Sequence, residues 1–312
     1  MKIVFLDKQH FQQADEVFDY SLLNFLGTVV CYNTTTDEEL FSRINDADII
    51  ILLKTQLPGS VIGNLKKTRL ICKLGTGYDN IDVQTAKAVG IKVTNFPGYG
   101  ESMVAQWTMT LMLMLAGNVL LYDKASRANQ WQASQFMYPI TEIHNKTLGI
   151  IGYGSIGKQV AKMAQVLGMK ILVSTKYADN ASNIGFVDKE TIYRNSDFIS
   201  LHSLLNDETR AMVDTKAFQM MKQSGYLINT GRAALVCKES LKTALESHTI
   251  SGAAIDGFWQ EPPEQNDPLL TLNNIIITPH VGWSSHETRQ RLLQSVSHKI
   301  KDFIDGNAIH TL

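Results

Sequence analysis

The fold is decided by one stretch of the chain, LGIIGYGSIGKQVAKMAQVLGMKILVSTK at residues 148–176. It opens with a short apolar run, passes through a turn that contains Gly152, Gly154 and Gly157, and ends in a second apolar run at 170–175. Between the two runs, KQVAKMAQVLG has the spacing of an amphipathic helix. A strand, a glycine turn, a helix and another strand form the repeating unit of a parallel sheet covered by helices.

The glycine turn follows the G-x-G-x-x-G pattern, in the strand-to-helix context that gives this pattern its meaning. We expect Gly152 to permit the tight turn, Gly154 to let the backbone approach a pyrophosphate, and Gly157 to let the helix pack closely on the strand. The N–H groups at the helix start, at Ser155 and Ile156, would then face the anion. The motif therefore predicts a dinucleotide site, with an ordinary glycine-rich turn as the alternative.

The end of the second strand bears on which dinucleotide is bound. A ribose-binding Asp or Glu is usual at this point, whereas this chain has Ser174, Thr175 and Lys176. Hydroxyl and ammonium groups can bind a 2′-phosphate, which a carboxylate would repel. The stretch therefore favours NADP, with NAD possible. In the alternative interpretation Lys176 is only solvated and Asp179 binds the ribose.

Similar apolar runs alternate with helical patterns along the whole chain. These runs lie at 2–6, 48–53, 69–75, 91–96, 147–152, 170–175, 197–202, 225–230, 252–258 and 274–280. Continuous apolar strands separated by helices indicate parallel sheets that are covered on both faces. The strands are too many for one small sheet, and 312 residues suit two domains.

The composition excludes several classes of protein. With 44% apolar and 19% charged residues the chain is globular, and 29 basic against 30 acidic side chains give no electrostatic case for nucleic acid or an anionic membrane. Cys31, Cys72 and Cys237 are too few and too widely spaced for a zinc site or a disulfide framework, so we expect no metal. Since MKIVFLDKQH lacks the features of a signal peptide, we expect a cytoplasmic protein.

One uncharged segment, from Ser102 to Tyr122, is long enough to span a membrane. Polar residues such as Gln106, Thr108 and Asn118 interrupt it, and the chain has no second segment of this kind. A helix that is apolar on all sides is more often buried inside a large protein or between subunits. We therefore expect a buried helix and no membrane partner.

Ionisable residues follow three strands in the second half of the chain. Arg232 comes after GYLINT, Glu261 after GAAIDGF, and His280 after NIIITP. In an open α/β sheet, ligands bind beyond the carboxyl ends of the strands, so these residues are expected beside the glycine turn. Alternatively, Glu261 begins a solvated turn with Pro262 and Pro263, and His280 is a capped loop residue.

The three side chains suit the reduction of a ketone by a nicotinamide. The new alkoxide needs a proton donor, and histidine is the usual donor near neutral pH. A neighbouring carboxylate, Glu261, would hold the imidazole of His280 protonated. The forked guanidinium of Arg232 would bind a substrate carboxylate or polarise the carbonyl group.

Longer motifs surround these residues. They are LGTGYDNID at 74–82, NFPGYGESMVAQW at 95–107, GYGSIG at 152–157, DFISLHSLLNDETR at 197–210, LINTGRAALV at 227–236, AAIDGFWQEP at 253–262 and TPHVGW at 278–283. In these motifs, and over nearly its whole length, the chain resembles the D-isomer-specific 2-hydroxyacid dehydrogenases. The resemblance implies that Arg232, Glu261 and His280 are the catalytic residues.

The resemblance also implies binding roles for residues that spacing alone does not single out. Backbone N–H groups around Gly75, Thr76 and Gly77 should hold the substrate carboxylate, and Arg232 and His280 should also contact the substrate. On the cofactor side, the resemblance implies roles for Asp256, Val104, Thr230 and His202. Asp256 should accept from the nicotinamide carboxamide, Val104 should lie close to the cofactor, and the other two lie on cofactor-side loops.

The fold that the resemblance implies has two doubly wound parallel-sheet domains. A Rossmann nucleotide-binding domain at 99–284 is inserted in a flavodoxin-like substrate domain formed by 1–98 and 285–312. The uncharged helix after Gly100 falls where this family forms a homodimer interface, which implies a homodimer rather than a membrane protein.

Within the family, NFPGYGESMVAQ and Trp283 are most similar to the glycerate dehydrogenase, or hydroxypyruvate/glyoxylate reductase, branch. Similar NADPH-using members also carry Ser or Thr and a basic residue after the second strand. The chain departs from the family pattern at Ala233-Ala234, at Leu204 and at Gln106. None of these removes a catalytic group, but Leu204 puts the adenosine pocket in question.

Two other functions stay open. One is the reduction of pyruvate to D-lactate, or of a bulkier 2-keto acid. The other is that of a corepressor of the C-terminal binding protein type, which shares the fold and the catalytic trio and uses the nucleotide to control assembly. Such proteins usually carry tail segments, and this chain stops at Leu312, so we expect an enzyme. Hydroxypyruvate and glyoxylate are the expected substrates.

Overall fold

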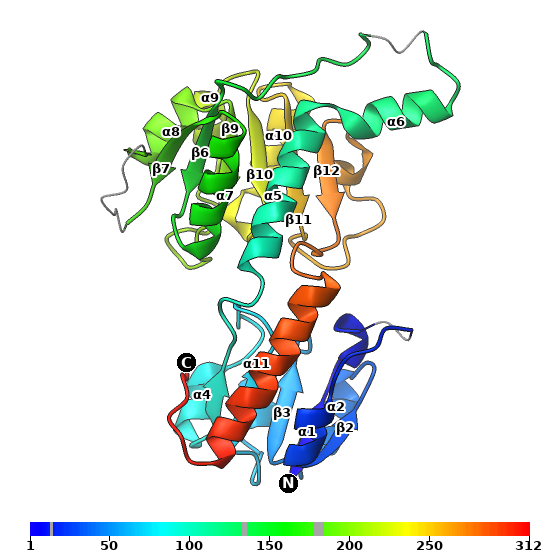
Figure 1. Ribbon diagram of the computed structural model, residues 1–312, viewed down its shortest axis with the longest axis vertical. Coiled ribbons are helices and arrows are strands. Elements are labelled where there is room, and N and C mark those ends of the chain that lie inside the picture. Colours follow the sequence, from blue (N-terminus) through cyan, green and yellow to red (C-terminus); the bar gives the residue numbers. More distant parts are fainter. Residues whose placement is uncertain (13–14, 133–135, 177–183) are drawn as a thin grey trace. The chain divides into compact units, whose positions relative to one another are not determined.

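Two compact units make up the structure, a computed structural model. It describes residues 1–12, 15–132, 136–176 and 184–312. One unit combines Met1–Gly100 with Ser284–Leu312, and the other is Glu101–Trp283. The second unit is thus inserted in the sequence of the first (Figure 1). The predicted junctions, after residues 98 and 284, differ from these bounds by one or two residues.

The first unit is built on a five-stranded parallel sheet in the order β2-β1-β3-β4-β5. Its strands are β1 (Lys2–Phe5), β2 (Thr28–Cys31), β3 (Ile49–Leu52), β4 (Leu70–Lys73) and β5 (Lys92–Thr94). This is the flavodoxin-like order 2-1-3-4-5. Every residue of β3 and β4 is buried, as their continuous apolar runs predict.

Helices cover this sheet. They are α1 (Ser21–Leu26), α2 (Asp37–Ile44), α3 (Gly59–Ile62), α4 (Val83–Ala88) and α11 (His286–Ile304), with the short 3₁₀ turn η1 (Lys8–His10). The longest of them, α11, is capped by Ser285, whose side chain accepts a hydrogen bond from the N–H of Thr288. Its buried residues include Leu292, Val296 and Ile300, which share one face at a spacing of four.

The second unit is built on a seven-stranded parallel sheet in the order β12-β11-β10-β9-β6-β7-β8. Its strands are β6 (Thr147–Ile151), β7 (Lys170–Ser174), β8 (Gly185–Phe186), β9 (Phe198–Leu201), β10 (Tyr226–Asn229), β11 (Gly252–Asp256) and β12 (Ile275–Thr278). Outward from β6 on its two sides, the order contains 3-2-1-4-5-6, the doubly wound order of dinucleotide-binding folds. The predicted class, two parallel α/β sheets, is confirmed.

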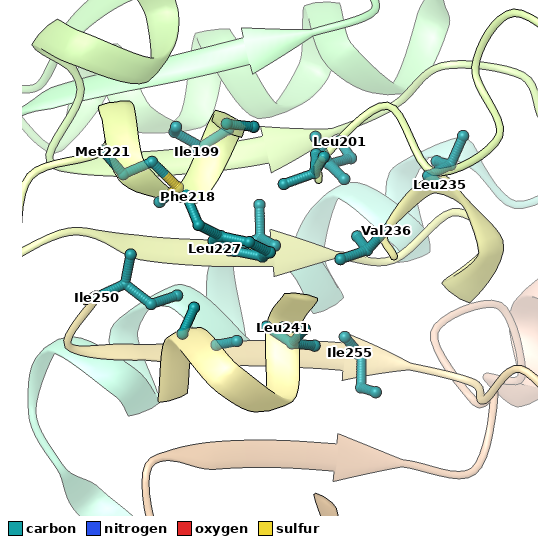
Figure 2. Packing of buried hydrophobic residues seen from close by; sticks show 14 of the residues in the cluster. Ile199, Leu201, Phe218, Met221, Leu227, Leu235, Val236, Leu241, Ile250 and Ile255 are labelled. Atoms are coloured by element: carbon teal, nitrogen blue, oxygen red, sulfur yellow. The ribbon is translucent and has the colours of Figure 1, made fainter. Parts of the chain in front are cut away.

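Helices cover both faces of this second sheet (Figure 1). They are α5 (Glu101–Ala116), α6 (Val119–Arg127), α7 (Ser155–Val166), α8 (Lys189–Asn195), α9 (Thr215–Met220) and α10 (Lys238–Glu246), with 3₁₀ turns η2 (Ala233–Leu235) and η3 (Pro268–Thr271). Successive strand residues point to opposite faces. Leu227 thus packs with Phe218 of α9 and Leu241 of α10 (Figure 2), whereas Ile228 belongs to the core that includes α5 and α7.

The uncharged segment at 102–122 forms two helices rather than the single helix that its composition suggests. Helix α5 ends at Ala116, Asn118 takes a left-handed φ of 45°, and α6 starts at Val119 at an angle of 59°. The side chain of Asn118 donates to the carbonyl of Pro139, which fixes the break. Among the described residues no single helix is long and apolar enough to cross a membrane, and only this bent pair passes by length and composition.

Candidate active site

The glycine turn joins β6 to α7. Gly152 has a φ of +97°, and a Cβ there would lie 2.5 Å from the carbonyl carbon of His202. A Cβ at Gly157 would lie 2.4 Å from the carbonyl oxygen of Gly152, so the helix start packs directly on the turn. A Cβ at Gly154 would meet nothing within 4 Å. The turn therefore has room for a ligand beside Gly154, although the binding role of these residues, with Ser155 at the helix start, stays a prediction.

The end of β7 carries a charge pair that sequence reasoning missed. Lys176 forms an ion pair with Glu208, and the two side chains are 70% and 69% exposed. The same contact holds the pKa of the Glu208 carboxyl below its usual value. Exposed pairs of this kind are weak, so Lys176 can exchange this partner for a phosphate. Asp179, the alternative ribose ligand, lies outside the described residues.

Two predicted cofactor-side residues make specific contacts near the strand ends. His202 follows β9, and its Nε2 lies 2.7 Å from the hydroxyl of Ser200. The residue is half-buried, and desolvation lowers the pKa of His202 to about 4, so the imidazole is neutral at pH 7. Thr230 follows β10, and its hydroxyl lies 2.7 Å from that of Thr108 on α5.

Thr108 connects two of the predicted positions. Its hydroxyl donates to the carbonyl of Val104, one turn earlier on α5. Because this hydroxyl has one proton to give, Thr230 must be the donor in the bond between the two threonines. Thr108 thus links the backbone of Val104 to the side chain of Thr230, although the sequence singled it out only as an interruption of an apolar segment.

Glu261 and His280 meet at the carboxyl edge of the sheet. They follow β11 and β12, which are neighbouring parallel strands. The Nδ1 atom of His280 lies 2.9 Å from Oε1 of Glu261, and the same oxygen accepts from the N–H of Phe258 at 3.2 Å. The two side chains are only 27% and 30% exposed. One ring nitrogen is therefore held by a carboxylate, which leaves Nε2 as the nitrogen that can exchange a proton with a substrate.

The backbone on either side of this pair is tightly specified. His280 itself has a φ of 59°. The buried carboxylate of Asp256 accepts from the N–H groups of Val281 and Gly282, at 2.8 and 2.7 Å, and from the hydroxyl of Thr278 at 2.6 Å. These bonds hold the turn that carries His280. The predicted bond from Asp256 to a nicotinamide carboxamide stays a prediction beside this observed role.

Gly257 makes room for the pair. Its φ is +102°, and a Cβ there would lie 2.7 Å from Oε1 of Glu261 and 3.4 Å from Nδ1 of His280. Only a glycine satisfies both the backbone conformation and the space. The signal for this residue is present in the sequence, where the motif AAIDGF places a glycine directly after the strand.

Arg232 follows β10, which neighbours β11, so it emerges at the same edge of the sheet as Glu261 and His280. The loop that carries it is held by Asn229, whose side-chain amide donates to the Arg232 carbonyl at 2.8 Å and accepts from the Gly231 N–H at 3.1 Å. Asn229 is 1% exposed and was not predicted as a site residue.

The three residues expected to hold the substrate carboxylate, Gly75, Thr76 and Gly77, belong to the other unit. They follow β4 after one residue, Leu74, at the carboxyl edge of its sheet. Gly75 is buried with a φ of +106°, and Thr76 is exposed. The loop thus begins at a buried residue, Gly75, and reaches the surface at Thr76.

Among the described residues, no three His, Cys, Asp or Glu side chains come together as metal ligands would. Cys31, Cys72 and Cys237 are all free thiols.

Comparison with known proteins identifies relatives that all belong to one type of dehydrogenase. The model of the D-isomer specific 2-hydroxyacid dehydrogenase, NAD binding domain, matches residues 109–282. A hydroxypyruvate reductase of Blautia hydrogenotrophica is 35% identical, with 100% of this chain and 99% of that protein covered. A glycerate dehydrogenase of Methylorubrum extorquens is 36% identical, with 98% and 96% covered.

Solved structures of other dehydrogenases and reductases share this fold over nearly the whole chain. An acyclic imino acid reductase in complex with NADPH and D-Arg superposes with a TM-score of 0.90 at 27% identity, with both chains fully covered. A D-lactate dehydrogenase from Aquifex aeolicus, complexed with NAD and lactic acid, has a TM-score of 0.88 at 25% identity, with 98% of this chain and 96% of that chain covered. With its NAD(P)-binding domain and the relatives above, the chain belongs to the D-isomer specific 2-hydroxyacid dehydrogenase family and is an oxidoreductase that acts on the CH–OH group of hydroxy acids.

Proposed function

We propose that the protein reduces small 2-keto acids, with hydroxypyruvate and glyoxylate as the preferred substrates. The observation that carries the proposal is the 2.9 Å contact between His280 and Glu261 at the carboxyl edge of the second sheet. Relatives named hydroxypyruvate reductase, glycerate dehydrogenase and, in Thermococcus litoralis, glyoxylate reductase support this choice of substrates.

Each residue has a role that its geometry allows. His280 gives the proton on Nε2 to the carbonyl oxygen as that oxygen gains negative charge. Glu261 holds Nδ1, so it fixes the orientation of the ring. Arg232 binds the substrate carboxylate or polarises the carbonyl group, and the loop Gly75–Gly77 binds the carboxylate through N–H groups. A bound nicotinamide dinucleotide supplies the hydride.

The proposal includes a preference for NADPH over NADH. It is supported by the absence of a carboxylate at the end of β7, where Ser174 is followed by Thr175 and Lys176. The ammonium of Lys176 is exposed and is paired only weakly with Glu208. Glu208 thus places a carboxylate beside the predicted 2′-phosphate position. Because it competes with the phosphate for Lys176, it should reduce the preference for NADPH over NADH.

The test is to follow the oxidation of NADPH and of NADH with hydroxypyruvate, glyoxylate and pyruvate as substrates. The proposal expects the fastest turnover with one of the first two acids and a higher kcat/KM for NADPH. Faster turnover of pyruvate would instead assign the D-lactate-type function. If no keto acid is turned over although NADPH binds, the corepressor-like function gains support.

The proposal also includes a homodimer. Three apolar side chains near the break between α5 and α6 are 42%, 49% and 48% exposed, namely Leu113, Val119 and Leu120. A cavity of about 830 Å³ beside them is lined mainly by apolar side chains, among them Leu121 and Ile276. It lies at the amino ends of β10, β11 and β12, away from the predicted catalytic edge, so a partner could cover it without blocking the site. Cytoplasmic localisation stays a prediction.

A further inference from the structure

We propose that Asn95 is a positioning residue that aims the N–H groups of the loop Gly75–Gly77 at the substrate carboxylate. The proposal rests on the function proposed above and gives a role to Asn95, the first residue of the motif NFPGYGESMVAQW. It concerns contacts within the first unit alone.

Three successive carbonyl groups, those of residues 74, 75 and 76, each accept a hydrogen bond from a donor in the interior of the first unit. The carbonyl of Leu74 accepts from Nζ of Lys73 at 2.7 Å. The carbonyl of Gly75 accepts from the N–H of Phe96 at 2.9 Å. The carbonyl of Thr76 accepts from the side-chain amide of Asn95 at 2.7 Å. Asn95 and Lys73 are only 6% and 7% exposed, so these donors are fixed parts of the interior.

Peptide geometry turns these bonds into a direction for the N–H groups. In a trans peptide the carbonyl of one residue and the N–H of the next point in opposite directions. Holding the carbonyls of residues 74, 75 and 76 therefore points the N–H groups of Gly75, Thr76 and Gly77 away from Lys73, Phe96 and Asn95, respectively. In the described part of the chain none of these three N–H groups donates to a protein acceptor. Successive outward N–H groups form a concavity that suits an anion.

The donor segment is itself fixed by helix α11. Nζ of Lys299 donates to the carbonyl of Asn95 at 2.9 Å and to the hydroxyl of Thr94 at 3.2 Å. The same ammonium lies 4.4 Å from the centre of the Phe96 ring. The loop is therefore preorganised through a chain of contacts that runs from α11 to residues 94–96 and on to the N–H groups.

The chemistry explains why an asparagine stands at this position. Its Nδ2 atom makes the bond to Thr76, whereas its Oδ1 atom is buried without a hydrogen-bond partner among the described residues. Only Nδ2 of the amide forms a hydrogen bond. The unpaired, buried Oδ1 lowers the stability of the fold, and the bond from Nδ2 to Thr76 must offset that cost. An aspartate of the same shape could not donate, and its charge would face the Thr76 carbonyl.

The test compares the variants Asn95→Leu and Asn95→Asp with the wild type, by steady-state kinetics with NADPH and glyoxylate. We expect the KM for glyoxylate to rise about 10- to 100-fold in both variants, while the dissociation constant of NADPH changes by less than about twofold. With glycolaldehyde, which lacks the carboxylate, the same variants should keep kcat/KM within about threefold of the wild type.

A matched control is Thr68→Val. It removes a buried side-chain bond of 2.9 Å to the carbonyl of Ala47, at the amino edge of the same sheet. We expect this variant to lose stability and to keep the wild-type KM. A wild-type KM in Asn95→Leu would overturn the proposal, as would an equal loss with glycolaldehyde, because Asn95 would then be a structural residue only.

Two further arms keep the test decisive. If Asn95→Leu does not fold, Lys73→Met releases the Leu74 carbonyl instead, and the same rise in KM, about tenfold, is expected. Binding of oxalate to the NADPH complex, measured by calorimetry, is a readout independent of turnover. A wild type that neither turns over glyoxylate nor binds oxalate would overturn the proposed function together with this inference, whereas an active wild type with an unchanged Asn95→Leu would overturn only the inference.

Discussion

At the scale of single residues, the imidazole of His280 has one defined partner. Its Nδ1 atom is held by Glu261, and its backbone is fixed by the turn bonded to Asp256. We predict that His280→Ala lowers kcat by about 100- to 10,000-fold, because general acid catalysis contributes on that scale. Titration by fluorescence should show NADPH binding within about twofold of the wild type, since the variant keeps the glycine turn. Full activity would contradict the assignment.

Gly257 offers a separate test of the same pair. A methyl group there would lie 2.7 Å from Oε1 of Glu261, so Gly257→Ala should push the carboxylate off the imidazole. We predict a loss of about 10- to 100-fold in kcat/KM, the size that a small displacement of a catalytic group produces.

The matched control for Gly257 is Gly90→Ala. Gly90 also has a positive φ, of +78°, but a Cβ there would meet nothing within 4 Å. Both variants should lose about 1 kcal/mol of stability, as judged by urea unfolding, because alanine is strained in this conformation. Only Gly257→Ala should lose activity, and an equal loss in both variants would mean that backbone strain alone is responsible.

His202 predicts a pH dependence of stability. Its pKa is lowered to about 4 in the folded protein, against about 6.5 for an ordinary histidine. Between these values the unfolded chain binds a proton that the folded chain does not, so the free energy of unfolding falls as pH falls through this window and is fully recovered above pH 6.5.

The variant His202→Asn should lose less stability than the wild type when pH drops from 7 to 5. We expect the difference to be at most about 2 kcal/mol, discounted because the residue is half-buried rather than fully buried. Urea unfolding at both pH values measures it. His298→Asn serves as a control at a histidine on α11 outside the site, and parallel pH dependence in His202→Asn and the wild type would contradict the lowered pKa.

The contacts between site residues could be predicted from the sequence only in part. Glu261 and His280 were expected together because they follow separate strands at one sheet edge, a rule that needs no side-chain contacts. Glu208, Asn229 and Thr108 were not expected as site residues. The partner of Thr108 is 122 residues away and that of Glu208 is 32 away, so these contacts depend on packing that no local pattern encodes.

At the scale of elements, most strands were predicted from the sequence, the edge strands β5 and β12 among them, whereas the other two edge strands were not. Strands such as β3, β4 and β10 are buried at every residue and appear as continuous apolar runs. The missed strands are β2 and β8. Residues of β2 are exposed or half-buried at the sheet edge, and β8 has two residues, so neither has the long, fully buried run of a central strand. The helix break after α5 was missed because Gly117-Asn118 interrupts an otherwise unbroken apolar pattern.

The carboxyl end of β7 is the element that should choose the cofactor. We predict that Lys176→Ala lowers kcat/KM for NADPH by about 10- to 100-fold and leaves NADH nearly unchanged, because only NADPH offers a phosphate to the ammonium. Glu208→Gln should have the opposite effect, raising kcat/KM for NADPH a few-fold, since it removes a competing and mostly exposed partner.

Lys162→Ala, on the helix that follows the glycine turn, is the control for a general loss of positive charge. Steady-state kinetics with both cofactors measures all three variants. Equal changes with NADPH and NADH in Lys176→Ala would mean that the lysine does not read the 2′-phosphate, and Asp179 would become the residue to test.

At the scale of the whole molecule, the exposed apolar side chains on α5 and α6 predict self-association. We expect the wild type to be a dimer by light scattering after size-exclusion chromatography, and Leu120→Glu to shift it toward monomer, because a charge would be buried in the interface. Val89→Glu is the control, since Val89 is exposed to a similar extent, 45% against 48%, but belongs to the other unit. A monomeric wild type would remove the proposed interface.

The insertion of one unit in the other sets an order for synthesis of the protein. Strands β1 to β5 leave the ribosome before the inserted unit, yet their own unit is completed only by residues 284–312, which are made after it. Arg289 of α11 forms an ion pair with Glu16, Lys299 holds Asn95, and the N–H of Leu312 donates to Val93. The inserted unit can therefore fold once Trp283 has been synthesised. Residues 1–100 can complete their unit only after α11 has been synthesised, and until then their apolar surface is accessible to chaperones.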